Sequence, residues 1–197
     1  MSGLGLPTGG GGDFVPYCKY NAKAGRWYTK NDAGEEFEVQ NFKAYFDFPN
    51  IKTGLFKFAA GEAPEQRFDS AVGTGDAADG GDPKFKRGFQ LNVFNPKALG
   101  GVREFSSTAG AVNGQMNMLY GAYAEAPEAK EGKIPMVECT GVTPVESKHG
   151  INYEPQLKIV KWGARPDDFD AVGGAEEAAP APAQTPPPAA PDDDEEF

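Results

Sequence analysis

Apolar and polar residues alternate over several short stretches of this chain, a pattern typical of β-strands with one buried face. The clearest stretch is 84–94, KFKRGFQLNVF. Its apolar face would consist of Phe85, Phe89, Leu91 and Val93. Shorter stretches of the same kind are 51–58, 102–107, 136–142 and 156–162. The chain is therefore predicted to be mainly β.

The alternation changes phase between Glu36 and Phe48. Phe37 and Val39 share one face, whereas the apolar residues of 42–48 share the other. A phase change inside a strand-like run is typical of a β-bulge, or of a strand that bends around a barrel corner. We expect one of these two features here.

One stretch, 108–124, has helical periodicity instead. Its apolar face would consist of Val112, Met116, Leu119 and Tyr123. Ser107 or Thr108 can cap its N-terminus, and Pro127 lies beyond its end. Strands, one helix and two closing strands follow the order of a five-stranded OB-like Greek-key barrel, with the helix between strands 3 and 4.

Three segments lack such periodicity. Residues 1–13 are rich in glycine, and residues 61–83 are expected to form a long, mobile loop. Residues 167–197 are rich in Pro, Ala and acids. We predict a flexible Gly-rich lead over 1–13, an OB-like domain over 14–166 and a disordered acidic tail over 167–197.

The net charge of -10 describes the tail and not the domain. Residues 1–166 hold all 19 Lys and Arg and 19 of the 29 Asp and Glu, so their charges balance. The other 10 acids lie in residues 167–197, which have no base. A sequence pI of 4.6 therefore does not argue against a nucleic-acid partner for the domain.

Cations and aromatic rings are interleaved in three segments, 17–30, 84–89 and 156–162. Sequence-tolerant binding of a single strand needs cations along the phosphates and rings that stack on bases. The cations expected to hold phosphates are Lys19, Lys23, Arg26, Lys84, Lys86, Arg87, Lys158 and Lys161. The rings expected to stack on bases are Trp27, Tyr28 and Phe89. We expect all of them to converge in one groove, although most aromatic residues of a small β domain fill its core.

The chain has few of the residues that metal sites and catalytic sites use. His149 is the single histidine, and Cys18 and Cys139 lie far apart without a CxxC motif. No nucleophile, metal-ligand or phosphate-loop motif occurs, so we predict no enzyme activity, no metal and no cofactor. The two cysteines are interpreted as buried thiols rather than a disulfide. Because no apolar run reaches the ~20 residues of a membrane span, we expect a cytoplasmic protein with no membrane partner.

The tail ends in AEEAAPAPAQTPPPAAPDDDEEF, which combines a Pro/Ala spacer with five acids and a phenylalanine. Its partner-binding residues are predicted to be Asp192, Asp193, Asp194, Glu195, Glu196 and Phe197. An acidic run imitates a phosphate backbone and can compete with DNA for the cationic groove. Phe197 adds an apolar plug suited to a basic-rimmed pocket on a partner protein. A plain solubilising tail is the alternative interpretation.

In this tail and in four stretches of the domain, the chain resembles the phage single-stranded-DNA-binding proteins of the podovirus type. The four stretches are NIKTGLFKF, KFKRGFQLNVFNP, GGVREFSSTA and INYEPQLKIVKWGARP. The resemblance implies an OB fold, a homodimer, and recruitment of replication or recombination proteins through the tail. The segment 61–83 departs from the family pattern.

The function we predict is therefore that of a single-stranded DNA-binding protein in phage or prophage DNA replication and recombination. The main alternative is a phage structural or adaptor protein with a solubilising acidic tail. A DNA mimic that inhibits nucleic-acid enzymes is a third possibility, but the balanced charge of residues 1–166 disfavours it.

Overall fold

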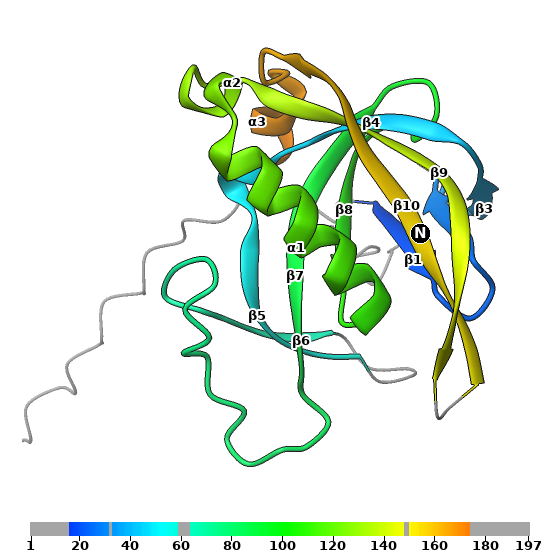
Figure 1. Ribbon diagram of the computed structural model, residues 1–197, viewed down its shortest axis with the longest axis vertical. Coiled ribbons are helices and arrows are strands. Elements are labelled where there is room, and N and C mark those ends of the chain that lie inside the picture. Colours follow the sequence, from blue (N-terminus) through cyan, green and yellow to red (C-terminus); the bar gives the residue numbers. More distant parts are fainter. Residues whose placement is uncertain (1–15, 32, 59–63, 148–149, 174–197) are drawn as a thin grey trace, which may run out of the picture.

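The structure is a computed structural model that describes residues 16–31, 33–58, 64–147 and 150–173 (Figure 1). The strands are β1 (Tyr17–Asn21), β2 (Arg26–Lys30), β3 (Glu36–Val39), β4 (Phe42–Phe46), β5 (Lys52–Lys57), β6 (Glu65–Phe68), β7 (Lys86–Asn95), β8 (Gly101–Ser107), β9 (Ile134–Ser147) and β10 (Gly150–Gly163). The helices are α1 (Gly110–Glu125), α2 (Pro127–Lys130), α3 (Asp168–Gly173) and the 3-10 turn η1 (Phe48–Asn50). The predicted lead 1–13, His149 and the tail residues 192–197 lie outside the described residues.

The ten strands form one mixed sheet that does not close into a barrel. Its order is β10-β9-β4-β7-β8-β1-β2-β3, and β5 and β6 branch from it at β7. Every pair is antiparallel except β1 with β8. The prediction of a mainly β fold is confirmed. A five-stranded barrel with a single helix is not confirmed, because the described residues contain more strands and helices than that plan has.

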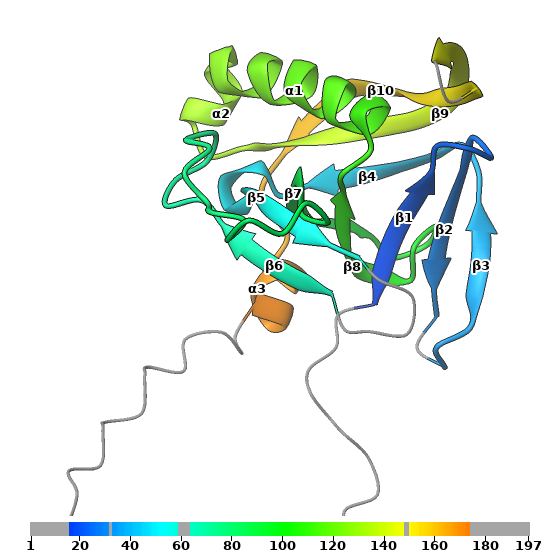
Figure 2. The same cartoon turned by 90° about the horizontal axis from the view of Figure 1, so that it is seen from below.

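One apolar core lies between the curved sheet and α1. The strands contribute alternate residues such as Trp27, Phe89 and Phe105, all buried. Helix α1 contributes Val112, Met116 and Leu119, which were predicted to form its apolar face. Figure 2 shows α1 on one side of the sheet and α3 on the opposite side.

Helix α1 begins slightly later than its predicted cap. The residue before its first turn is Ala109, which has no capping side chain. The Ser107 hydroxyl oxygen instead accepts the Ala109 N–H at 3.1 Å. The helix is therefore stabilised mainly by its buried face, as expected for a helix containing three glycines.

The phase change at 36–48 is a break between two strands, so the prediction of a bulge or bend within one strand was wrong. Asn41 lies between β3 and β4 with φ of 49°, a left-handed conformation that Asn tolerates better than most residues. The two strands then have different neighbours. Strand β3 pairs with β2, whereas β4 pairs with β7 and β9.

The segment 61–83 was predicted to be a long loop, but in its described part it contains β6 and a series of aspartate caps. Asp69 accepts the Ala77 N–H at 3.0 Å, and Asp76 accepts the Ser70 N–H at 2.9 Å. Asp69 also holds both arms of the Arg87 guanidinium, at 2.8 and 2.5 Å. Local carboxylate caps satisfy the backbone without any periodicity in the sequence, which is why pattern analysis saw only a loop.

The stability of this segment should depend on pH, because it relies on the ionised carboxylate of Asp69. The Arg87 guanidinium and further hydrogen bonds from Thr53 and Ala77 hold the pKa of Asp69 well below its usual 3.8. Since the native pKa is depressed, its stabilisation is complete above about pH 4 and is lost as the pH falls through the native pKa. In urea melts, we expect Asp69→Asn to be less stable than wild type at pH 7 and to lose less stability between pH 4 and pH 2. Parallel curves over that range would contradict the role of Asp69.

The folded domain continues past residue 166, where the sequence placed the start of a disordered tail. Helix α3 follows, and Phe169 is buried against Phe94, Val102 and Ile134. Arg165 anchors the approach to α3, because its guanidinium donates to both carboxylate oxygens of Asp47 at 2.9 and 2.8 Å. The sequence did not predict α3, because a single aromatic residue within an acidic segment is too weak a signal of a buried helix.

None of the helices in the described part of the chain has the length and apolar character needed to span a bilayer.

Candidate nucleic-acid interface

The strand register places a series of polar and aromatic residues on the side of the sheet that faces away from the core, here called the outer face. Its members on β5, β7, β8, β1 and β2 are Lys52, Lys86, Gln90, Asn92, Glu104, Ser106, Tyr17, Lys19, Arg26, Tyr28 and Lys30. Each alternates with a residue that points inward. On β1, for example, Tyr17 and Lys19 flank the buried Cys18. The outer face is therefore continuous across five strands.

Four residues of β1 and β2 form a compact cluster on this face, here called the tyrosine platform: Tyr17, Lys19, Tyr28 and Lys30. The Lys19 ammonium lies 5.4 Å from the Tyr17 ring centroid and 5.5 Å from that of Tyr28. The Lys30 ammonium lies 5.1 Å from the Tyr17 ring. Both rings are partly exposed. The platform thus combines π-faces and cations, the two features that a single strand requires.

Acids of β3 hold this platform in place. The Tyr17 hydroxyl donates to Glu36 at 2.5 Å, and the Lys19 ammonium lies 2.6 Å from the same carboxylate. Burial and Glu36 raise the pKa of Tyr17 to about 12, whereas the bonds from Lys19 and Tyr17 lower the pKa of Glu36. The phenol is therefore neutral and the carboxylate charged at neutral pH. Arg26 similarly pairs with Glu38 at 2.8 Å.

Two of the three rings predicted to stack on bases are in the core, and this part of the prediction is corrected. Trp27 is 6% exposed and Phe89 is 4% exposed. The Trp27 ring packs against Tyr20, Phe42 and Phe105 with centroids 5.0 to 5.4 Å away. Neighbouring residues of a strand point to opposite faces, so Trp27 and Tyr28 cannot both lie on one platform.

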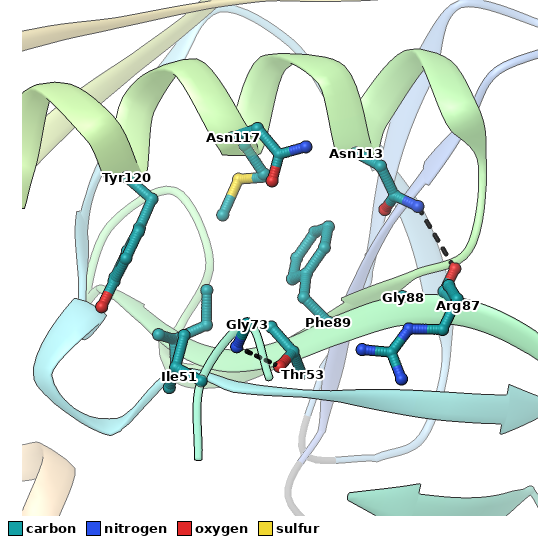
Figure 3. Close-up of a pocket in the computed structure, with 11 residues that line it drawn as sticks. Ile51, Thr53, Gly73, Arg87, Gly88, Phe89, Asn113, Asn117 and Tyr120 are labelled. Atoms are coloured by element: carbon teal, nitrogen blue, oxygen red, sulfur yellow. Dashed lines mark hydrogen bonds between the residues drawn. The ribbon is translucent and has the colours of Figure 1, made fainter. Parts of the chain in front are cut away.

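Arg87 and Phe89 line a cavity of about 300 Å³ between α1 and strands β5 and β7 (Figure 3). This cavity is on the inner side of the sheet, opposite the tyrosine platform. The Asn113 amide donates to the Arg87 carbonyl at 3.2 Å at one end of it. The Arg87 charge is neutralised by Asp69, so Arg87 anchors the 69–83 segment rather than lying with the other predicted cations.

The remaining predicted cations are spread over several elements. Lys23 lies in the β1–β2 turn and Lys84 precedes β7, while Lys86 is on the outer face at the start of β7. Lys158 and Lys161 are exposed on β10. Five strands separate β10 from β2 in the order of the sheet, although the Tyr153 N–H of β10 donates to the Ala22 carbonyl in the β1–β2 turn at 2.7 Å. The structure therefore places Lys19, Arg26 and Tyr28 on the same face of one hairpin, whereas the two lysines of β10 belong to another hairpin, which β10 forms with β9.

Tyr17 and Lys30 were not among the predicted site residues, although a signal for them was present. Residues 17–19 and 26–30 alternate in period two, so Tyr17, Lys19, Tyr28 and Lys30 are compatible with one side of a hairpin. Choosing residues by type rather than by alternation led to Trp27 in place of Tyr17.

No group of three or more His, Cys, Asp or Glu in the described residues could hold a metal ion. Both cysteines are free and buried, and burial raises the pKa of the Cys18 thiol to about 12. Comparison of the chain with protein families, with curated proteins and with solved structures finds no match.

Proposed function

We propose that this protein binds single-stranded DNA through the outer face of its sheet, in phage or prophage DNA replication and recombination. The observation that carries the proposal is the tyrosine platform, in which the Lys19 ammonium lies between two partly exposed rings. An exposed platform of this kind favours bases whose faces are free. A duplex hides its base faces, so it would be bound far less well.

The strand order supports an OB-like origin of this face. Strands β5, β7 and β8 pair antiparallel in that order, with β6 inserted in the chain between β5 and β7. Helix α1 follows, and β9 and β10 form the closing hairpin. In OB barrels the face of strands 2 and 3 binds oligonucleotides. Strands β7 and β8 correspond to these two strands under our proposal. The meander β1–β2–β3 extends their outer face, since β1 pairs with β8 where an OB barrel would close.

The acidic segment at residues 192–197 is proposed to compete with DNA for the cations of the outer face and to recruit replication proteins. The position of α3 supports this role, because Phe169 packs on Phe94 and Val102, two residues at one end of the outer face. Helix α3, which contains the last described residues, therefore lies on the same side of the sheet as the tyrosine platform.

The proposal is tested by measuring the affinity of the protein for a labelled oligo-dT of 30 nucleotides and for a duplex of the same length, at 50 and 200 mM salt. We expect the single strand to bind and the duplex to bind much more weakly. If the outer face neutralises about four phosphates, the log–log salt slope is about -2.8, and fourfold more salt lowers the affinity by about 50-fold. Equal binding of both DNAs would contradict the platform, and binding of neither would favour the adaptor alternative.

A further inference from the structure

A second group of exposed rings and cations lies on the outer face at the other end from the tyrosine platform. It is formed by β5 with the residue that follows it, by β6 and by the start of β7. It is here called the phenylalanine platform and consists of the exposed Lys52, Phe58, Phe68 and Lys86 around the buried Phe56. Phe58 and Phe68 are exposed by 52% and 36%, which is unusual for phenylalanine. They pack on the buried Phe56, with ring centroids 6.2 and 5.9 Å from its own.

Cations accompany these rings as they do the tyrosines. The Lys52 ammonium lies 4.9 Å from the Phe68 ring centroid. Lys86 is the register partner of Phe56 across β5 and β7. It is exposed, and no ion pair of Lys86 occurs within the described residues. The phenylalanine platform therefore offers both π-faces and positive charge to a ligand.

One transverse row of the sheet joins Lys52, at the edge of the phenylalanine platform, to the tyrosine platform. Lys52 is opposite Gln90, and Gln90 is opposite Ser106. Strands β8 and β1 are in register at Phe105 and Cys18, so the next residue of each continues the row from Ser106 to Lys19. Lys19 is opposite Tyr28. The row crosses four strand spacings, about 19 Å, and Phe68 on β6 adds a fifth, about 24 Å in all.

The middle of this row is polar and contains an unsatisfied group. The Gln90 amide donates to Glu104 at 2.5 Å, while its Oε1 is a buried acceptor without a hydrogen-bond partner in the described structure. Such acceptors are uncommon in folded proteins. Because this oxygen is buried, a ligand on the outer face does not reach it directly. The neighbouring Glu104 carboxylate repels phosphate. Phosphates should therefore bind the lysines at the two ends of the row.

We infer that one DNA strand crosses the sheet at right angles to the β-strands and occupies both platforms at once. This inference rests on the proposed function and gives the path of the ligand and a lower limit to its length. At 3.4 Å per stacked nucleotide, a span of about 24 Å corresponds to about seven nucleotides. Oligomers long enough to reach both platforms should bind more tightly, because binding to one platform holds the rest of the oligomer at a high effective concentration near the other.

The experiment measures the binding of oligo-dT of 4, 8, 12 and 16 nucleotides to the full chain. Wild type should gain more than 10-fold in affinity between 4 and 12 nucleotides. The double variant Phe58→Ala/Phe68→Ala should lose most of that gain, as should Tyr28→Ala. Met118→Ala removes an even more exposed apolar side chain from α1 and should leave the gain unchanged.

Charge variants test the same path without touching the aromatic rings. Lys52→Gln/Lys86→Gln should make the salt slope for the 12-mer shallower by about 1.4, because about 0.7 is lost for each phosphate contact with a single strand. Lys130→Gln on α2 is the matched control. If Tyr28→Ala weakens binding while both phenylalanine-platform variants behave as wild type, the second platform is overturned and the proposed function stands. If the wild type binds no oligomer, the proposed function itself fails.

Discussion

Replacing Tyr17 and Tyr28 together by alanine is expected to lower the affinity for single-stranded oligo-dT by roughly 30-fold or more. Each base stacked on an aromatic side chain contributes about 1–3 kcal/mol, so two rings contribute at least about 2 kcal/mol. Both rings are partly exposed on the outer face, so their loss should leave the core intact. Fluorescence anisotropy with a 12-mer at low salt measures the change, and circular dichroism checks the fold.

Phenylalanine variants separate the rings from their hydroxyl groups. Tyr17→Phe keeps the π-face but removes the 2.5 Å bond to Glu36, and Tyr28→Phe changes only the hydroxyl of the second ring. Both should bind within a fewfold of wild type if stacking is the main contribution. Wild-type affinity in the double alanine variant would contradict the tyrosine platform.

Replacing the Glu36 carboxylate should change the affinity for DNA in the opposite direction to the tyrosine variants. It lies 2.6 Å from the Lys19 ammonium and therefore competes with phosphate for that cation. Glu36→Gln removes the negative charge while leaving an oxygen that can accept the Tyr17 hydroxyl. In the same anisotropy assay it should tighten binding and steepen the salt dependence, which makes it a useful counterpart to the alanine variants.

Replacing Phe169 by alanine is expected to lower the free energy of unfolding by about 3–5 kcal/mol. The Phe169 ring is 1% exposed and packs against Phe94 with centroids 5.9 Å apart, so truncation leaves a cavity. Urea denaturation followed by tryptophan fluorescence measures the loss. An unfolding free energy within 1 kcal/mol of wild type would show that α3 is not an integral part of the domain.

Two truncations are the matched controls for this prediction. A chain that ends at Arg165 lacks α3 and should be destabilised as much as the Phe169 variant. A chain that ends at Gly173 keeps α3 and should be as stable as wild type. Any test of the acidic segment as a competitor of DNA must therefore use the second truncation, because the first alters the domain itself.

The end of the folded domain shows what could be predicted from local sequence patterns and what could not. The sequence placed the start of the tail at residue 167, because the acids begin there and bases end at Arg165. Asp168 and Asp170 are indeed exposed, but Phe169 between them is buried. Charge composition averages over several residues, whereas docking of a short helix depends on one side chain and the cavity that receives it.

The candidate site divides in the same way. Lys19, Arg26 and Tyr28 were predicted from the sequence and do lie together on the outer face. Phe58 and Phe68 were not chosen, because an apolar side chain at a strand position is expected to be buried. Lys158 was chosen for its charge alone, and it lies on β10, which is not a neighbour of β1 or β2 in the order of the sheet.

The sequence by itself determined most of the strands, the helix α1 and the separation of charge between residues 1–166 and 167–197, because these follow from periodicity and composition over neighbouring residues. It did not reveal β6 or the break between β3 and β4. Only the tertiary structure decided which side of each strand is the outer face. Alternation states that Trp27 and Tyr28 point in opposite directions, but not which of them meets the core. That choice depends on Phe42 and Phe105, residues distant in the chain that pack around the Trp27 ring. The platform on the opposite side is a consequence of that packing.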